Sequence, residues 1–220
     1  MCGRFTQIAS AEALREHFQL DASAIATTVS YNIAPTQQIL TLSDAGSAGY
    51  LKLRRWGLIP SWIKNQRLAA PLINARSETV AEKPSFKQSF VRRRCLIPAT
   101  GYYEWSNKIP YYFSLKQQPL FSFAGIWAVW TNGKDETIES VAIITTKANE
   151  LTAKYHSRMP VIIPQEHYQS WLTAVDTDSV RELLQPYFSE KMQVWQVSQA
   201  VNSYRCNVPT CIEPINEKTN

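Results

Sequence analysis

The stretch PLFSFAGIWAVW at residues 119–130 predicts a long β-strand. It is rich in aromatic and β-branched side chains, and turn-forming residues bound it. Runs of the same character occur elsewhere along the chain, at 37–42, 50–56, 94–105, 110–115, 138–145 and 191–197. Many short strands of this kind favour an antiparallel sheet that curls towards a barrel.

Helical segments lie between these strands. Residues 10–19 (SAEALREHFQ) begin with Ser10 as a candidate N-cap and place apolar Leu14 and Phe18 four residues apart. Further helices are predicted at 84–92, 147–155, 165–173 and 178–187. The fold class that follows is α+β. We expect a single β-rich domain over residues 1–220, with antiparallel strands curled towards a barrel and several short helices.

Local signals place some helix ends. Pro164 suits the first turn of the helix at 165–173, and Asp176 or Asp178 could cap the helix at 178–187.

A phosphate-cradling glycine loop and the βαβ signature of parallel sheets are absent from the sequence. These features do not favour a nucleotide-binding doubly wound fold.

The charge balance is basic, with a formal net charge of +5, and the chain has seven Trp, ten Tyr and eight Phe. Cations that track phosphates and rings that stack on bases suit single-stranded nucleic acid. The same composition also suits a tryptophan-rich core with lysines scattered outside. Composition alone leaves both interpretations open.

Metal, secretion and membrane signals are weak. The four cysteines include no C-x-x-C pair and there are three histidines, so we expect no metal and no cofactor. The first twenty residues lack an apolar signal segment, and no apolar run approaches the ~18 residues of a membrane span. We expect a soluble monomer without a membrane partner, cytoplasmic or, in a bacterium, nucleoid-associated.

The chain opens MCGRFTQIAS, with a cysteine as its second residue. If Met1 stays, Cys2 is an ordinary thiol near a chain end, where chains are usually frayed. If Met1 is removed, Cys2 becomes a 1,2-aminothiol. Such a group captures an aldehyde twice, because nitrogen forms an imine and sulfur then closes a five-membered thiazolidine.

Five separated segments combine reactive polar groups with aromatic residues and prolines. They are YNIAPTQ (31–37), WGLIPSW (56–62), PLINARSET (71–79), PATGYYEW (98–105) and YHSRMPVIIP (155–164). Together with the MCGRF start, and in this order, they closely resemble the SRAP family, the SOS-response-associated peptidases. The resemblance runs to about Val201, and the tail SYRCNVPTCIEPI matches less clearly, so Cys206 and Cys211 receive no role.

The resemblance implies an abasic-site processing protein of the DNA damage response. In this family the mature N-terminal cysteine forms a stable thiazolidine crosslink with the ring-opened sugar of an abasic site in single-stranded DNA. The positions that match the family's catalytic residues are Cys2, Asn74, Glu104 and His156. The positions that match its DNA-contacting arginines and aromatics are Arg4, Arg76, Arg158, Trp62 and Trp105. The implied fold is a single β-rich α+β domain with a positively charged groove.

Elementary chemistry is consistent with these roles. An abasic sugar is mostly a closed hemiacetal, and a histidine suits the proton transfer that opens it. The attacking α-amine has an ordinary pKa of about 7.7–8.0, so a useful fraction is neutral near pH 7. Glu104 lies among Tyr102, Tyr103 and Trp105, which should desolvate its carboxylate and raise its pKa. Asn74 can orient the amine or the thiol.

Each of these residues also has a plain structural interpretation. His156, Glu104 and Asn74 could be a bonded histidine, a strand surface and a loop turn, and most tryptophans are expected in the core. The run Arg92, Arg93, Arg94 is interpreted mainly as the solvated end of a helix, with DNA contact second. Two other functions stay open: a thiol peptidase using Cys2 and His156, which includes self-removal of Met1, and a noncovalent single-strand binder.

Overall fold

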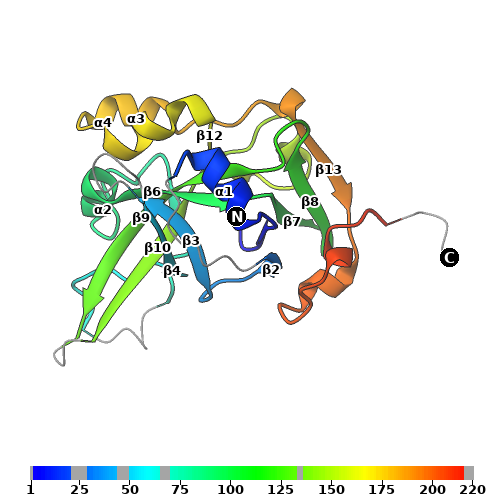
Figure 1. Cartoon of the computed structure of the whole chain (residues 1–220), viewed down its shortest axis with the longest axis horizontal. Helices are drawn as coiled ribbons and strands as arrows, with labels where there is room; N and C mark the ends of the chain where they lie inside the picture. The colour runs from blue at the N-terminus through cyan, green and yellow to red at the C-terminus, as the bar shows by residue number, and fades with distance from the viewer. Residues whose placement is uncertain (1, 21–28, 44–49, 65–69, 133–135, 216–220) are drawn as a thin grey trace.

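The computed structural model describes residues 2–20, 29–43, 50–64, 70–132 and 136–215. Among these, five strands close a barrel in which each strand is hydrogen-bonded to the next (Figure 1). Their order is β10 (Thr137–Lys147), β4 (Tyr50–Trp56), β3 (Gln38–Ser43), β6 (Arg94–Ala99) and β9 (Phe121–Thr131). The ring closes because β9 also pairs with β10, from Thr131 opposite Thr137 to Gly125 opposite Ile143. Closure leaves these strands without an open edge.

A second sheet lies beside the barrel and carries the start of the chain (Figure 1). Its order is β13 (Met192–Gln196), β8 (Ile109–Leu115), β7 (Gly101–Ser106), β1 (Phe5–Gln7) and β2 (Ser30–Ile33). All of its pairings are antiparallel. The strand predicted at 94–105 is therefore two strands that belong to different sheets. The chain crosses between them at Thr100, whose Oγ1 accepts a hydrogen bond from the Ile8 amide.

Short strands extend the barrel near its ends. β11 (Arg158–Pro160) pairs antiparallel with β10, β12 (Ile162–Ile163) pairs antiparallel with β9, and β5 (Asn74–Arg76) runs parallel to β10. β4 also runs parallel to β10. The α+β class with strands curled into a barrel is confirmed. Most pairings are antiparallel, and the two parallel pairings both involve β10, which pairs with β4 and with β5.

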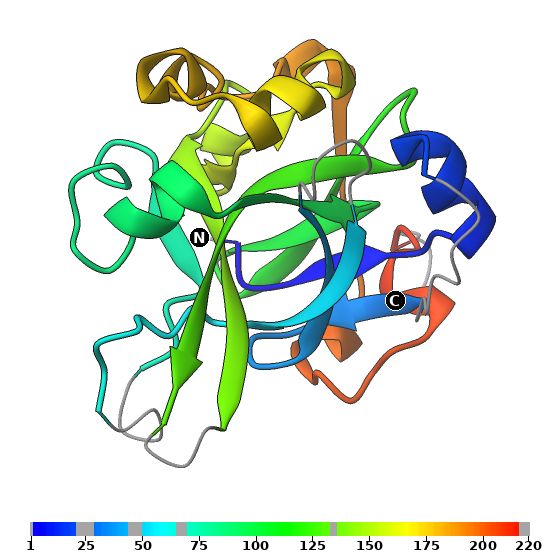
Figure 2. The same cartoon turned by 60° about the vertical axis from the view of Figure 1, so that its left-hand side comes forward.

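The helices are short and lie at several places around the strands. The α-helices of the described residues are α1 (Ala11–Phe18), α2 (Lys87–Arg92), α3 (Tyr168–Thr173) and α4 (Thr177–Glu182). Figure 2 shows α3 and α4 together above the strands. Ser10 caps α1 by accepting from the Ala13 amide at 3.1 Å, and Asp176 caps α4 through the Asp178 and Ser179 amides. Both capping predictions hold, with Asp176 as the cap of α4.

Single 3₁₀ turns occupy several connections, at Thr152–Lys154 (η2), Gln165–His167 (η3), Ser189–Lys191 (η4), Gln199–Asn202 (η5) and Pro209–Cys211 (η6). The helix predicted at 147–155 is wrong. β10 continues to Lys147, opposite Arg158, and Asn149 Oδ1 then accepts from the Thr152 amide at 2.8 Å to start one 3₁₀ turn. Likewise, the helix predicted at 178–187 ends at Glu182, and Pro164 precedes a 3₁₀ turn that leads into α3.

The interpretation of Arg94 as part of a solvated helix end is also wrong. Arg94 begins β6 and is buried, and its guanidinium donates to the carbonyl oxygens of Trp171 (2.6 Å), Phe90 (2.8 Å) and Ala174. These carbonyls lie in the C-terminal turns of α2 and α3, so the Arg94 guanidinium links both helices to β6. Arg92 remains exposed.

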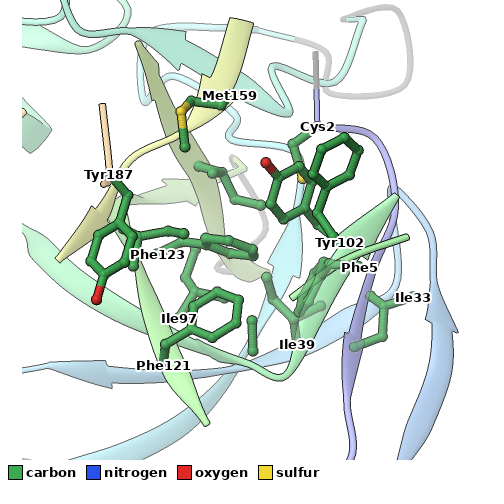
Figure 3. Close-up of a cluster of buried hydrophobic side chains, with 14 of the residues drawn as sticks. Cys2, Phe5, Ile33, Ile39, Ile97, Tyr102, Phe121, Phe123, Met159 and Tyr187 are labelled. Carbon is green, nitrogen blue, oxygen red and sulfur yellow. The ribbon is translucent and has the colours of Figure 1, made fainter. Parts of the chain in front are cut away.

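The largest apolar cluster lies where the barrel meets the second sheet. Phe5 contacts Trp56 edge to face at 5.2 Å between ring centroids, and Tyr102 stacks on Phe113 at 5.0 Å. Figure 3 shows Cys2 within this cluster, beside Tyr102. The expectation that tryptophans are mostly core holds for Trp56, Trp130 and Trp171 but not for Trp62, which is 64% exposed.

Candidate active site around Cys2

Cys2 lies just before β1 and is fully buried in the chain that retains Met1. Antiparallel pairing of Phe5 with Tyr102, and a 3.0 Å hydrogen bond from the Tyr103 amide to the Arg4 carbonyl, bring this end of the chain alongside β7. The Cys2 Sγ lies 3.8 Å from the Arg4 carbonyl oxygen. Burial, assisted by the negative charge of Glu104, raises the pKa of the Cys2 thiol well above its ordinary value. The thiol is therefore protonated near neutral pH.

Asn74 holds the backbone of Cys2. It is the first residue of β5, where pairing with Ile143 of β10 fixes its position. Its Nδ2 donates to the Cys2 carbonyl at 2.9 Å. Its Oδ1 is buried and has no hydrogen-bond partner among the described residues. A buried acceptor of this kind is suited to receive an N–H or S–H group placed beside it.

Glu104 lies on β7 opposite Tyr111 and is 3% exposed. Burial raises the pKa of its carboxyl, and the positive charges of the amino terminus and of His156 partly offset this effect. The same carboxylate raises the pKa of Cys2 and of Tyr102, so these groups share one electrostatic environment. A carboxyl with a raised pKa can exchange protons closer to neutral pH than an ordinary one.

His156 interacts electrostatically with Glu104. It follows the 3₁₀ turn η2, where its amide donates to the Thr152 carbonyl at 2.9 Å. Its Nδ1 accepts from the Arg158 amide at 3.0 Å. Nδ1 also lies 3.1 Å from the Arg158 carbonyl oxygen, so its role as donor or acceptor depends on the tautomer of the ring. The structure thus brings together Cys2, Asn74, Glu104 and His156, which come from four distant parts of the chain.

The predicted DNA-binding arginines lie near this site but differ in exposure and in the hydrogen bonds that their side chains make. Arg76 ends β5 and is exposed. Arg158 makes a bidentate ion pair with Glu78, at 2.9 and 3.0 Å, and donates to the Thr145 carbonyl at 2.6 Å. Arg4 donates to Asn32 Oδ1 at 2.7 Å and to the carbonyls of the 201–202 turn. Arg4 and Arg158 therefore have structural partners already.

The two tryptophans predicted to contact DNA, Trp62 and Trp105, also differ in exposure. Trp62 presents most of its surface to solvent, so its ring is available to stack on another molecule. Trp105 is half-buried on β7, and its Nε1 donates to Asn202 Oδ1 at 2.7 Å. That bond joins β7 to the C-terminal segment.

Sequence reasoning missed Asn32, which organises the surroundings of Arg4. Asn32 is 1% exposed, and besides accepting from Arg4 its Nδ2 donates to the carbonyls of Val201, Ser203 and Cys206. The sequence signal for Asn32 is the segment YNIAPTQ, which contains it but does not indicate the role of any single residue. Tyr102, which the sequence predicts among the aromatics around Glu104, also lies beside Cys2, and its hydroxyl contacts Thr152 Oγ1 at 3.4 Å.

The structure joins a closed barrel to a second sheet. A cysteine near the start of the chain is held there by an asparagine, beside a buried carboxylate and a histidine. This combination of fold and site defines the class of domain to which the chain belongs. The family model described as SOS response associated peptidase (SRAP) matches residues 1–204. The chain belongs to the SRAP family.

Relatives and solved structures agree with this assignment. The chain is 43% identical to "Abasic site processing protein YoqW" of Bacillus subtilis (strain 168), over 97% of this chain and 99% of that protein. It is 32% identical to "Abasic site processing protein HMCES" of Rattus norvegicus, over 73% of this chain and 55% of that protein. A crystal structure of a protein from Bacteroides thetaiotaomicron has a TM-score of 0.87 at 28% identity, and covers 98% of this chain and 100% of that one. Among the described residues, no helix combines the length and apolarity needed to cross a membrane.

Proposed function

We propose that this protein captures abasic sites in single-stranded DNA as a covalent thiazolidine with Cys2, after Met1 has been removed. The observation that carries the proposal is the hydrogen bond from Asn74 to the Cys2 carbonyl beside the buried carboxyl of Glu104. It fixes the backbone of the one residue whose amine and thiol can both react. The names of the relatives, as abasic site processing proteins, support the choice of DNA lesion.

The first step opens the sugar. The C1′ hydroxyl of the hemiacetal loses a proton and the ring oxygen gains one, which exposes the C1′ aldehyde. His156 is suited to the donating role, because the Arg158 backbone engages its Nδ1 and the protonated ring can give a proton from Nε2. The Arg158 and Glu78 ion pair helps to hold the strand that supplies this amide.

The second step joins the two molecules. The neutral amine of Cys2 attacks C1′, the carboxyl of Glu104 gives a proton to the departing hydroxyl so that water leaves, and an iminium forms. The Cys2 sulfur then bonds to C1′ and gives up its proton, which Glu104 accepts. One aldehyde and one aminothiol thus become one thiazolidine and one water. Asn74 Oδ1 is available to accept from the amine and hold it towards C1′.

The raised pKa of the Cys2 thiol argues against a peptidase whose nucleophile is a cysteine thiolate. Such enzymes lower the pKa of the cysteine, whereas burial and Glu104 raise the pKa of Cys2. In the aminothiol reaction the amine attacks first and the thiol needs to lose its proton only when the ring closes. The self-removal of Met1 concerns a residue outside the described part of the chain.

Single strands are the expected form of the DNA. The exposed Trp62 can stack on an unpaired base, and Arg76 is free to approach a phosphate. Neither contact reads base identity, so little sequence preference is expected. The protein would act as a soluble monomer on DNA in the cytoplasm or nucleoid.

The test uses single-stranded oligonucleotides and a denaturing gel. An oligonucleotide with a true abasic site should give a heat-stable adduct, and one with a tetrahydrofuran site should give none, because that sugar cannot open to an aldehyde. Cys2→Ser with Met1 removed should form an imine that borohydride traps but no stable adduct. A variant that keeps a residue ahead of Cys2 has an amide in place of the amine and should form neither. Normal crosslinking by that extended variant would disprove the aminothiol mechanism, and a thiol peptidase predicts tolerance of the extension but not of the serine.

A further inference from the structure

Two cysteines near the C-terminus have no place in the proposed reaction. Cys206 and Cys211 are free, and their Sγ atoms lie 3.4 Å apart. Cys211 ends the 3₁₀ turn η6 and is 1% exposed, whereas Cys206 is partly exposed. The Cys211 thiol also lies 3.5 Å from the Cys206 carbonyl oxygen. The backbone therefore already turns the two side chains towards each other.

The distance is short enough for a bond with little rearrangement. A disulfide needs an S–S separation of about 2.05 Å, so the sulfur atoms must approach by roughly 1.4 Å. Rotation of two side chains within a six-residue loop can supply a movement of this size. By contrast, Cys95 is fully buried inside the barrel and has no cysteine partner among the described residues.

The segment that contains the pair is bonded to the strands that carry the candidate site. The Cys206 carbonyl accepts from Asn32 Nδ2 at 2.7 Å, and Asn32 accepts from Arg4, two residues after Cys2. The Tyr103 hydroxyl, which donates to the Tyr31 carbonyl at 2.6 Å, also lies 3.4 Å from the Cys211 carbonyl oxygen, and Tyr103 is next to Glu104 in the chain. Residues 199–212, called the C-terminal strap below, thus connect both cysteines to β2 and β7, and through Asn32 to Arg4 just before β1.

We propose that Cys206 and Cys211 form a reversible oxidation site that a low-molecular-weight disulfide such as oxidised glutathione converts to an internal disulfide. Cys206, the more exposed thiol, attacks one sulfur of oxidised glutathione, and one glutathione leaves. Cys211 then attacks the Cys206 sulfur and releases the second glutathione. The two cysteine protons end on the two glutathione thiols, so the protein is oxidised by two electrons and the oxidant is reduced by two.

The expected consequence is a C-terminal strap that opens less often. Closing a loop of six residues removes chain entropy from the opened state, which corresponds to a roughly 40-fold change in the opening equilibrium if the native geometry is unstrained. Because burial raises the pKa of the Cys211 thiol, its attack on the mixed disulfide should be faster at alkaline pH. This inference does not rest on the proposed function, because neither thiol takes part in crosslinking.

The experiment equilibrates the full chain in reduced and oxidised glutathione buffers, then quenches with acid, alkylates under denaturing conditions and digests with trypsin. Cleavage after Arg205 leaves both cysteines in the peptide 206–218. At the oxidising end this peptide should lose two hydrogen atoms and escape alkylation, while Cys95 is alkylated throughout. A peptide that stays alkylated, that carries only bound glutathione or that is linked to another chain would overturn the proposal.

The effect on the strap is measured by hydrogen exchange of residues 199–212 before and after oxidation. Exchange should slow by up to roughly 40-fold in the oxidised protein. Cys206→Ser, which cannot form the disulfide and changes one partly exposed atom, is the matched control and should show no response to oxidant. Unchanged exchange in a protein whose disulfide has formed would refute the locking role.

Discussion

Replacement of Glu104 by Gln separates what this carboxyl does for the reaction from what it does to the fold. The side chain is 3% exposed and its pKa is raised chiefly by burial. Glutamine keeps the shape and removes the exchangeable proton. If Glu104 is the general acid and base, crosslinking should slow by ~10²–10⁴, which is about 2.7–5.4 kcal/mol in activation free energy.

The same substitution should stabilise the protein above the raised pKa. A carboxyl whose pKa is higher in the folded than in the unfolded state binds its proton more tightly when folded. Its contribution to stability is therefore present below the unfolded value and is lost as the pH rises through the folded value. Each unit of elevation corresponds to about 1.36 kcal/mol. Glu104→Gln should unfold at a higher temperature than the parent at pH 8, with a smaller difference at pH 4.

The assay is single-turnover crosslinking from pH 5 to pH 8, read on a denaturing gel, with thermal unfolding recorded in the same buffers. Binding of the tetrahydrofuran oligonucleotide, followed by fluorescence anisotropy, is the control and should change little. A variant that crosslinks at the parent rate would refute the catalytic role. A variant that is slow but less stable at pH 8 would show that the loss comes from damage to the fold.

Three other predictions concern single features. Asn32→Leu removes one acceptor of Arg4 and the side-chain donor of the Val201, Ser203 and Cys206 carbonyls, of which Val201 keeps Arg4 as a partner. The free energy of unfolding should therefore fall by roughly 3–5 kcal/mol in urea titrations. An effect below 1 kcal/mol would mean that water replaces the amide. Gly101→Ala places a Cβ 2.2 Å from the Tyr112 ring and should cost about 1–3 kcal/mol, which calorimetry would detect as a lower melting temperature. Binding to single strands should weaken with salt with a log–log slope near −0.7 per phosphate neutralised, and equal crosslinking of intact duplexes carrying the same lesion would count against the proposed substrate.

Much of the local structure could be predicted from the sequence. The runs at 50–56, 110–115 and 119–130 are strands with nearly the predicted limits, and Ser10 and Asp176 cap the helices that follow them. These predictions succeed because side-chain shape and short-range hydrogen bonds act within a few residues. The helix predicted at 147–155 failed because β10 extends to Lys147 through its pairing with β11, a contact that composition does not reveal.

The sequence by itself determined the family, through five ordered segments and the MCGRF start, and it named the four residues that meet at the candidate site. Only the tertiary structure decided how they meet. Parallel pairing of β5 with β10 carries Asn74 to the Cys2 carbonyl, and antiparallel pairing of β1 with β7 carries Cys2 to Glu104. It also decided that Arg94 is buried and that Arg4 and Arg158 have structural partners. The physical reason is that burial, desolvation and hydrogen-bond partners arise between residues 28 to 197 positions apart, and these become neighbours only when the chain folds.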